Sequence, residues 1–236
     1  MTQRHDAGAQ RPPVRRAAGV PVYLWRHGRT AHNHGKVWQG RLDTDLDDVG
    51  RAQAATAARA LVQRLAGAPL TLVTSDLRRA ADTAAALTAL TGVEAVPDPR
   101  LRELDAGLWE GLTRDEVTAA GMGDDLAAWR RGEDVPVGRT GERRSEVGRR
   151  GAEGIGEHAA AVPDGGVLVV SSHGGVLRGS ILTLLGLDPD RWQLLAGLRN
   201  CHWAELLVET HGRGTAHERR TWKLVTYNAF AAEPLV

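Results

Sequence analysis

Apolar residues gather in short runs, separated by longer segments in which small apolar and charged residues are mixed. Three runs have the length and apolar content of buried strands: 20–25, 70–74 and 166–172. Four segments rich in Ala and Leu or Gly predict helices: 49–65, 78–90, 143–161 and 176–185. Strands that alternate with helices are typical of parallel βαβ units. The pattern predicts an α/β fold, a three-layer sandwich with a mostly parallel central sheet and helices on both faces.

The remaining segments complete a single-domain plan. Residues 113–131 predict short helical pieces, and residues 203–208 and 221–225 predict closing strands that include an antiparallel edge. Residues 1–19 are polar, contain Pro and lack apolar periodicity, so we expect a disordered leader. The sequence offers no linker after this leader, and residues 20–236 are expected to form one domain.

Composition narrows the class of protein. The chain has 236 residues, is 42% hydrophobic and has a net charge of +1, which argues against bulk attraction to nucleic acid or to a membrane. The single cysteine, Cys201, excludes an intramolecular disulfide and a cysteine-based zinc site, and we expect a buried structural thiol. Arg15-Arg16 could begin an export signal, but cleavage after the next apolar segment would remove the first strand. A cytoplasmic protein is therefore expected.

Candidate chemistry begins where the first strand ends. Arg26, His27 and Gly28 follow the apolar run directly, at the kind of turn where open α/β sheets gather ligands. An arginine can hold a phosphoryl group with two hydrogen bonds, and a neutral imidazole can attack phosphorus. A second imidazole, His173, follows the third strand and precedes Gly174. The sequence therefore predicts a phosphate site that contains a nucleophile.

Further polar residues fit the same site. Arg78 and Arg79 begin a helix just past the second strand, where backbone amides and a guanidinium can share one anion. A loop carries Glu103, Asp105 and Glu110, any of which could act as an acid. His32-x-His34 has metal-ligand spacing, but further ligands at the usual spacing do not accompany it. Neither a metal nor a cofactor is expected.

Five short motifs occur in one order between Val20 and Cys201: Arg-His-Gly-x-Thr-x-x-Asn, Gln-Gly, Ser-x-Leu-x-Arg-Ala, Leu-x-Glu and Ser-His-Gly. Together they resemble the histidine phosphatase superfamily, also called phosphoglycerate mutase-like. The resemblance implies that His27 is the nucleophile and that Glu103 is the acid. It selects Arg79, the arginine directly before Ala, over Arg78. The other residues that it implies are Arg26 and His173 for phosphoryl binding, and Asn33, Gln39, Gly40 and Gly174 around the substrate.

The resemblance predicts a metal-independent phosphomonoesterase that acts on a small-molecule phosphate ester through a phosphohistidine. Segments 39–46 and 75–80, with Trp38, look most like the actinobacterial glucosyl-3-phosphoglycerate phosphatases and related broad-specificity enzymes. A sugar phosphate or a phosphoglycerate ester is the expected substrate. Whether the chain forms a homodimer, and whether it acts on a phosphoprotein, are left open.

Two alternatives remain, a 2,3-bisphosphoglycerate-dependent phosphoglycerate mutase and a non-catalytic phospholigand-binding relative. Three basic residues stand at the spacing of the mutase carboxylate ligands: Arg114, Arg130 and Arg131. Against a mutase, Ala106 replaces a tyrosine of the mutase pattern and Gly175 replaces an asparagine. Arg143 stands where the family pattern has a serine after Gly-Glu. A non-catalytic binder would be expected to lack either the nucleophile or the acid.

Overall fold

A six-stranded sheet forms the centre of the molecule in the computed structural model, which describes residues 19–212 and 217–231. The strands lie in the order β3-β2-β4-β1-β5-β6. Their bounds are β1 Val20–Arg26, β2 Leu70–Thr74, β3 Val96–Pro97, β4 Val167–Ser172, β5 Trp203–His211 and β6 Arg219–Ala229. The pairs β3-β2, β2-β4 and β4-β1 are parallel, whereas β1-β5 and β5-β6 are antiparallel. The predicted fold class is confirmed, including the antiparallel edge; the leader predicted at 1–19 lies outside the described residues except for Gly19.

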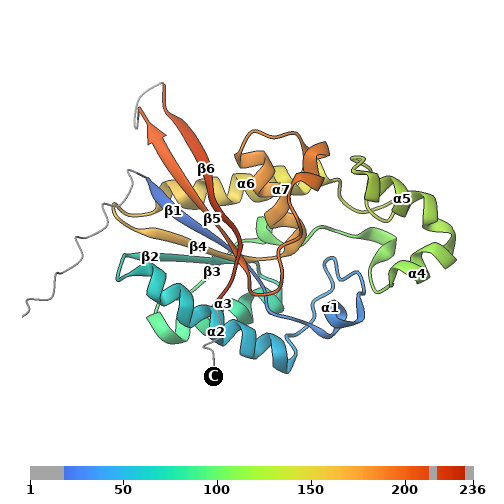
Figure 1. Cartoon of the computed structure of the whole chain (residues 1–236), viewed down its shortest axis with the longest axis horizontal. Coiled ribbons are helices and arrows are strands. Elements are labelled where there is room, and N and C mark those ends of the chain that lie inside the picture. The colour runs from blue at the N-terminus through green and yellow to red at the C-terminus, as the bar shows by residue number, and fades with distance from the viewer. Residues whose placement is uncertain (1–18, 213–216, 232–236) are drawn as a thin grey trace, which may run out of the picture.

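Helices connect the strands and cover the sheet (Figure 1). Their bounds are α1 Ala31–Gly35, α2 Asp48–Leu65, α3 Arg78–Thr91, α4 Arg114–Val117, α5 Gly123–Arg131, α6 Arg144–Ala161 and α7 Gly174–Leu184. Short 3₁₀ turns cover Pro99–Leu101, Gly107–Trp109 and Pro189–Leu194, and a π turn covers Thr118–Met122. The sequence pattern did not predict α1 or β3, which have five and two residues. In the described part of the chain, no helix is long and apolar enough to cross a membrane.

The alternation of side chains along β1 explains why both faces of the sheet are covered. Val22 and Leu24 point into one core, which they share with residues of α6 and α7. Tyr23 and Trp25 point into the opposite core, with residues of α2 and α3. Figure 1 shows α6 and α7 on one side of the sheet and α2 and α3 on the other. Because both faces are buried, the strand reads as a continuous apolar run.

A third apolar cluster lies beyond the carboxyl end of the parallel strands, where α4 and α5 pack (Figure 1). Its aromatic residues are Trp38, Trp109 and Trp129, whose ring centroids lie 4.9 to 6.3 Å apart. The backbone reinforces this contact, because Trp38 N donates to Leu112 O at 2.9 Å and Gly111 N donates to Trp38 O at 2.8 Å. The cluster therefore fixes α4 and α5 against the loop that follows α1.

The glycines of α6 allow it to pack closely on α7. A Cβ added at Gly151 would lie 2.2 Å from Ser180 Oγ and 2.6 Å from Val176 Cγ2. A Cβ added at Gly148 would lie 3.0 Å from the backbone carbonyl oxygen of Gly179. Gly156, in contrast, faces only Arg220 Nη1, at 3.8 Å. Glycine is thus required at the helix contact but not at position 156.

Replacing these glycines by alanine should change stability in opposite directions. Gly151→Ala should lower the free energy of unfolding by about 1–3 kcal/mol, because a methyl group overpacks the contact with Val176. Gly156→Ala, the matched control, should raise it by about 0.5–1 kcal/mol, because alanine loses less backbone entropy on folding. Denaturant unfolding of both variants measures the two changes. A stabilised Gly151→Ala variant would contradict this account of the α6 and α7 contact.

Candidate active site

The parallel pairing of β1 with β4 brings the two predicted histidines together. Arg26 pairs in register with Ser172 at the ends of these strands, and His27 N donates to Ser172 O at 2.8 Å. His173 directly follows the last residue of β4, so its ring lies beside that of His27, with ring centroids 5.1 Å apart. The residues were predicted from separate motifs; their proximity follows from strand order.

His27 is buried in the form that a nucleophile requires. The residue is only 2% exposed, and its Nδ1 lies 2.7 Å from Gly28 O. A carbonyl oxygen only accepts hydrogen bonds, so Nδ1 carries the proton and Nε2 keeps its lone pair. Burial, and then the charges of Arg26 and Arg79, hold the pKa of His27 well below its ordinary value. The imidazole is therefore neutral at physiological pH.

Asn200, which belongs to none of the sequence motifs, holds the backbone around His27 in place. Its Nδ2 donates to His27 O at 3.0 Å, to Gly28 O at 3.2 Å and to Asn33 Oδ1 at 3.0 Å. Asn33 Oδ1 also accepts from the backbone of Thr30, so the oxygen of this predicted ligand is used within the protein. The next residue, Cys201, is buried as expected, and burial raises the pKa of its thiol to about 12.

Arg79 is fully buried and Arg26 is half-buried, and among the described residues both bond to carbonyl groups and not to carboxylates. Arg26 Nη1 donates to Leu198 O at 2.6 Å, and Arg79 donates to Leu42 O at 2.7 Å and to Gly40 O at 2.8 Å. Within the described residues, the Nε atoms of both side chains are buried without a partner. Burial lowers the pKa of both guanidinium groups, which nevertheless remain charged. Each side chain is thus held firmly while part of its charge is left for an anion.

Arg78 takes a different direction, as the motif predicts. It is exposed and forms ion pairs with Asp43 and Asp45 at 3.1 Å each. Arg79, at the start of α3, is fully buried.

His173 is fully buried beside His27, behind the cavity wall. Its Nε2 lies 2.8 Å from Ser75 Oγ, and its Nδ1 is buried with no partner among the described residues. Burial, followed by the charges of Arg79, His27 and Arg26, holds the pKa of His173 well below its ordinary value. A buried polar atom without a partner is costly, so Nδ1 is suited to an oxygen of a bound group.

Glu103 is the carboxylate that the fold turns toward the histidines. Its oxygens accept from three backbone amides, Leu104 N at 2.9 Å and Gly175 N and Val176 N at 3.1 Å each. Gly175 permits this approach, because a Cβ there would lie 2.4 Å from Glu103 Oε1. The other two carboxylates of the loop are used elsewhere: Asp105 accepts from Gly107 N at 2.9 Å, and Glu110 accepts from Arg41 N at 2.7 Å.

Arg150 holds the loop that carries Glu103. It donates to the backbone oxygens of Arg100, Arg102 and Glu103 at 2.6, 2.8 and 3.0 Å. Glu142 pairs with Arg150 at 2.8 Å and also accepts from Asp105 N at 3.0 Å. Glu142 therefore retains a structural contact beside Arg143, the position at which the sequence departs from the family pattern.

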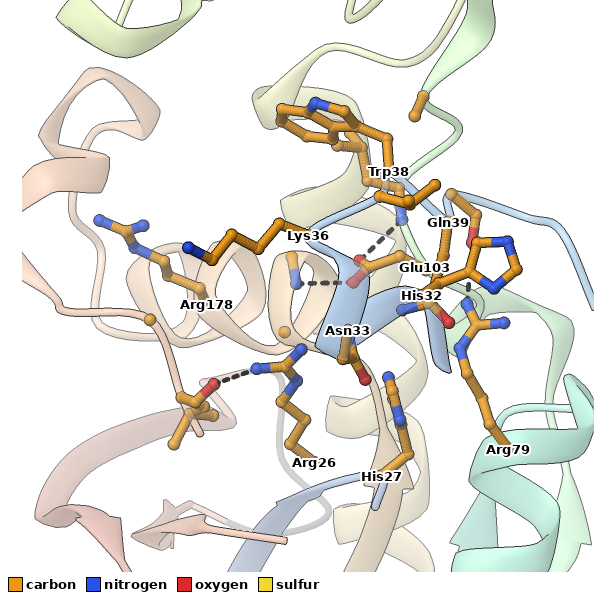
Figure 2. A pocket seen from close by; sticks show the side chains of 18 of the residues that line it. Arg26, His27, His32, Asn33, Lys36, Trp38, Gln39, Arg79, Glu103 and Arg178 are labelled. Atoms are coloured by element: carbon orange, nitrogen blue, oxygen red, sulfur yellow. Dashed lines mark hydrogen bonds between the residues drawn. The ribbon is translucent and has the colours of Figure 1, made fainter. Parts of the chain in front are cut away.

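Several of these side chains line a cavity of about 600 Å³ (Figure 2). The predicted site residue His173 is fully buried and does not line it. The predicted residues on its wall are Arg26, His27, Asn33, Gln39, Gly40, Arg79, Glu103 and Gly174. Of the three mutase-spaced cations, Arg114 lines the cavity and the other two do not. The wall also includes residues that were given no substrate role: His32, Lys36, Trp38, Trp129, Arg178 and Trp192. In the parts of the chain that the structure describes, no group of three or more His, Cys, Asp or Glu residues could hold a metal ion.

Known proteins resemble this chain in sequence and architecture. The profile of the histidine phosphatase superfamily (branch 1) matches residues 22–221. A glucosyl-3-phosphoglycerate phosphatase of Mycolicibacterium vanbaalenii is 41% identical over 221 residues, which cover 89% of this chain and 95% of that protein. A probable phosphoglycerate mutase of Yersinia enterocolitica is 35% identical over 190 residues, covering 77% and 82%. The structure of a mycobacterial glucosyl-3-phosphoglycerate phosphatase with VO3 has a TM-score of 0.77 and 36% identity, covering 89% and 99%.

The two buried histidines should make the protein sensitive to mild acid. Their pKa values are lowered in the folded state, so the unfolded chain binds more protons once the pH falls below about 6.5. Stability is retained above this pH. Below it, the free energy of unfolding should fall by about 1.4 kcal/mol per pH unit for each histidine.

Denaturant unfolding at a series of pH values from about 7.5 to about 5, which span the ordinary pKa of histidine, measures this slope. His27→Gln should make the slope shallower, and His34→Gln, at an exposed position of α1, is the matched control. Equal slopes in the native chain and the His27→Gln variant would contradict the burial of a neutral His27.

Proposed function

The chain belongs to the histidine phosphatase superfamily, and we propose that it is a phosphatase that hydrolyses phosphoglycerate esters through a phosphohistidine on His27. The observation that carries this proposal is the state of His27. Its protonated Nδ1 bonds to Gly28 O, which leaves the Nε2 lone pair for attack on phosphorus. Arg26 and Arg79 lie beside this imidazole and can neutralise the phosphoryl oxygens, and neutral His173 can donate a hydrogen bond to one of them.

The reaction follows from these positions in two displacements. In the first, His27 Nε2 forms a bond to phosphorus while the bond from phosphorus to the ester oxygen breaks, and Glu103 gives a proton to that departing oxygen. In the second, Glu103 takes a proton from water, and the water oxygen attacks phosphorus and releases inorganic phosphate from His27. Guanidinium groups supply the charge neutralisation, so the proposed mechanism uses no metal.

The relatives and the cavity support a phosphoglycerate ester as substrate. Two of the similar proteins are named glucosyl-3-phosphoglycerate phosphatases, and glucosyl-3-phosphoglycerate is the first candidate. The presence of Arg114 on the cavity wall is consistent with a second acidic group in the substrate. The presence of both His27 and Glu103 disfavours a non-catalytic binder.

One observation favours hydrolysis over the mutase reaction. Gly175 lies so close to Glu103 that any side chain at this position would overlap the carboxylate. The asparagine of the mutase pattern therefore does not fit beside Glu103 in this arrangement. A mutase must also keep water from its phosphohistidine while the substrate turns.

Turnover of the candidate substrates tests the function. The native enzyme should release inorganic phosphate from glucosyl-3-phosphoglycerate and 3-phosphoglycerate in the presence of a chelator. Vanadate, which resembles the transition state, should block this release. His27→Ala should lower turnover by at least ~10³-fold, because the nucleophile is lost. An acid-labile phosphoryl label on His27 during turnover is the direct readout.

The same assay separates the alternatives, with His34→Gln as the matched control for His27→Ala. Efficient interconversion of 3-phosphoglycerate and 2-phosphoglycerate that depends on the bisphosphate, without phosphate release, would establish the mutase instead. Substantial turnover by His27→Ala would contradict the covalent mechanism.

Glu103→Gln should distinguish substrates by their leaving groups. An alkoxide needs a proton to depart, whereas a nitrophenolate leaves without one, so the loss should be about 10²- to 10⁴-fold for alkyl esters and much smaller for aryl esters. Initial rates with glycerol 3-phosphate and p-nitrophenyl phosphate make the comparison. Asp105→Asn, in the same loop but turned from the cavity, is the control. Equal losses for both esters would remove Glu103 from the acid role.

A further inference from the structure

The cavity carries more positive charge than one phosphoryl group requires. Arg26 and Arg79 already stand beside His27, and Lys36, Arg114 and Arg178 line the outer part of the same cavity. Among the described residues, Glu103 is the only acidic side chain on this wall, and backbone amides bind its oxygens. Elsewhere, many arginines of this chain are paired with Asp or Glu. The outer cations therefore match a second negative charge on the ligand.

Arg178 is fixed in place and has no acidic partner. Its guanidinium stacks over the Trp192 ring, 4.7 Å from the centroid, and donates through Nη2 to Trp192 O. Its Nε is buried without a hydrogen-bond partner, and within residues 19–212 and 217–231 no carboxylate lies within ion-pair distance of it. Burial lowers the pKa of Arg178, which shows that its charge is poorly compensated.

Arg178 lies one helical turn from the phosphoryl site. It lies on α7 four residues after Gly174, and so about one helical turn, roughly 6 Å, from it. A Cβ added at Gly174 would lie 3.3 Å from Arg26 Nε, so this end of α7 borders the phosphoryl site. One helical turn is also about the distance that separates a carboxylate from the phosphorus of a phosphoglycerate.

Lys36 has a left-handed backbone conformation, which glycine adopts with less strain than lysine. It follows α1 in the left-handed region, with φ of 56°, and its N–H caps the helix. The chain has only one other lysine, Lys223, which pairs with Glu209 at 2.8 Å. The Lys36 ammonium has no such partner in the described part of the chain, and Figure 2 shows its side chain extending in the direction of Arg178.

We propose that Lys36 and Arg178 form a subsite for the carboxylate of the substrate, on the outer side of the phosphoryl site. The subsite rests on the proposed function, because it places a phosphomonoester with its phosphorus at His27. It assigns the substrate to the phosphorylated carboxylic acids rather than to neutral sugar phosphates or polyol phosphates. Arg178 supplies the oriented donor, and Lys36 closes the subsite from the opposite element, α1.

A matched pair of substrates tests this assignment. 3-Phosphoglycerate and glycerol 3-phosphate are both primary alkyl phosphates, and the second has a hydroxymethyl group in place of the carboxylate. The native enzyme should show a kcat/KM about 10- to 100-fold higher for 3-phosphoglycerate, as expected for one charge-assisted contact. Because the carboxylate is bound equally in the ground state and the transition state, the difference should lie mainly in KM.

Variants then locate the subsite. Lys36→Gly and Arg178→Gln should each lower the ratio of the two kcat/KM values by about tenfold or more. Lys36→Arg, which keeps the charge, should restore part of the ratio. Lys36→Gly relieves the left-handed backbone, so its melting temperature should not fall, and it keeps the test valid if Arg178→Gln folds poorly. Arg131→Gln is the matched control, because Arg131 pairs with Glu133 and does not line the cavity.

The outcomes separate this proposal from the proposed function. Turnover of p-nitrophenyl phosphate that depends on His27 but comes without any preference for 3-phosphoglycerate would overturn the carboxylate subsite alone. A preference that survives in both Lys36→Gly and Arg178→Gln would also overturn it. Absence of turnover for every phosphomonoester, including the aryl ester, would instead refute the phosphatase function.

Discussion

The parallel pairing of β1 with β4 is the constraint on which the site depends. It ends with Arg26 opposite Ser172, so the next residue of each strand, His27 and His173, projects at the same edge of the sheet. The helix that follows β4 then begins at Gly174 and offers its first free amides to Glu103. A slip of one residue in this register would turn the histidines to opposite faces and separate them.

Uncompensated positive charge is the second organising feature of the site. Arg26 and Arg79 are held by backbone carbonyls, which orient them without neutralising them. Two consequences follow from the same arrangement. The imidazoles remain neutral, because burial, and then the charges of both guanidinium groups, disfavour a proton on either ring, and the cavity is electrostatically prepared for a dianionic group. On the protein surface, by contrast, arginines such as Arg78 are neutralised by aspartates.

The acid is positioned in part by residues that do not line the cavity. Arg150 on α6 gathers three backbone oxygens of the loop around Glu103, and Glu142 holds Arg150 in turn. The close contact of α6 with α7, through glycines, sets the distance from this clamp to the amides that bind Glu103. On the other side, Arg144 lies 4.4 Å from the Trp129 ring centroid and 5.0 Å from that of Trp192, and so connects α5, α6 and the outer cavity wall. Packing far from the reaction centre thereby defines its shape.

The sequence by itself determined the fold class, the long helices and the main strands, because apolar periodicity and the residues at strand ends are local properties. Short motifs also identified Arg79 over Arg78 and drew attention to both histidines. The Leu-x-Glu motif also selected Glu103, but only the tertiary structure shows that amides of α7 bind Glu103, whereas Asp105 and Glu110 accept from other backbone amides. Asn200, Lys36 and Arg178 likewise gain their significance from contacts or cavity walls formed by segments distant in the chain. Local patterns cannot report such contacts, because strand order and helix packing, not nearby residues, create them.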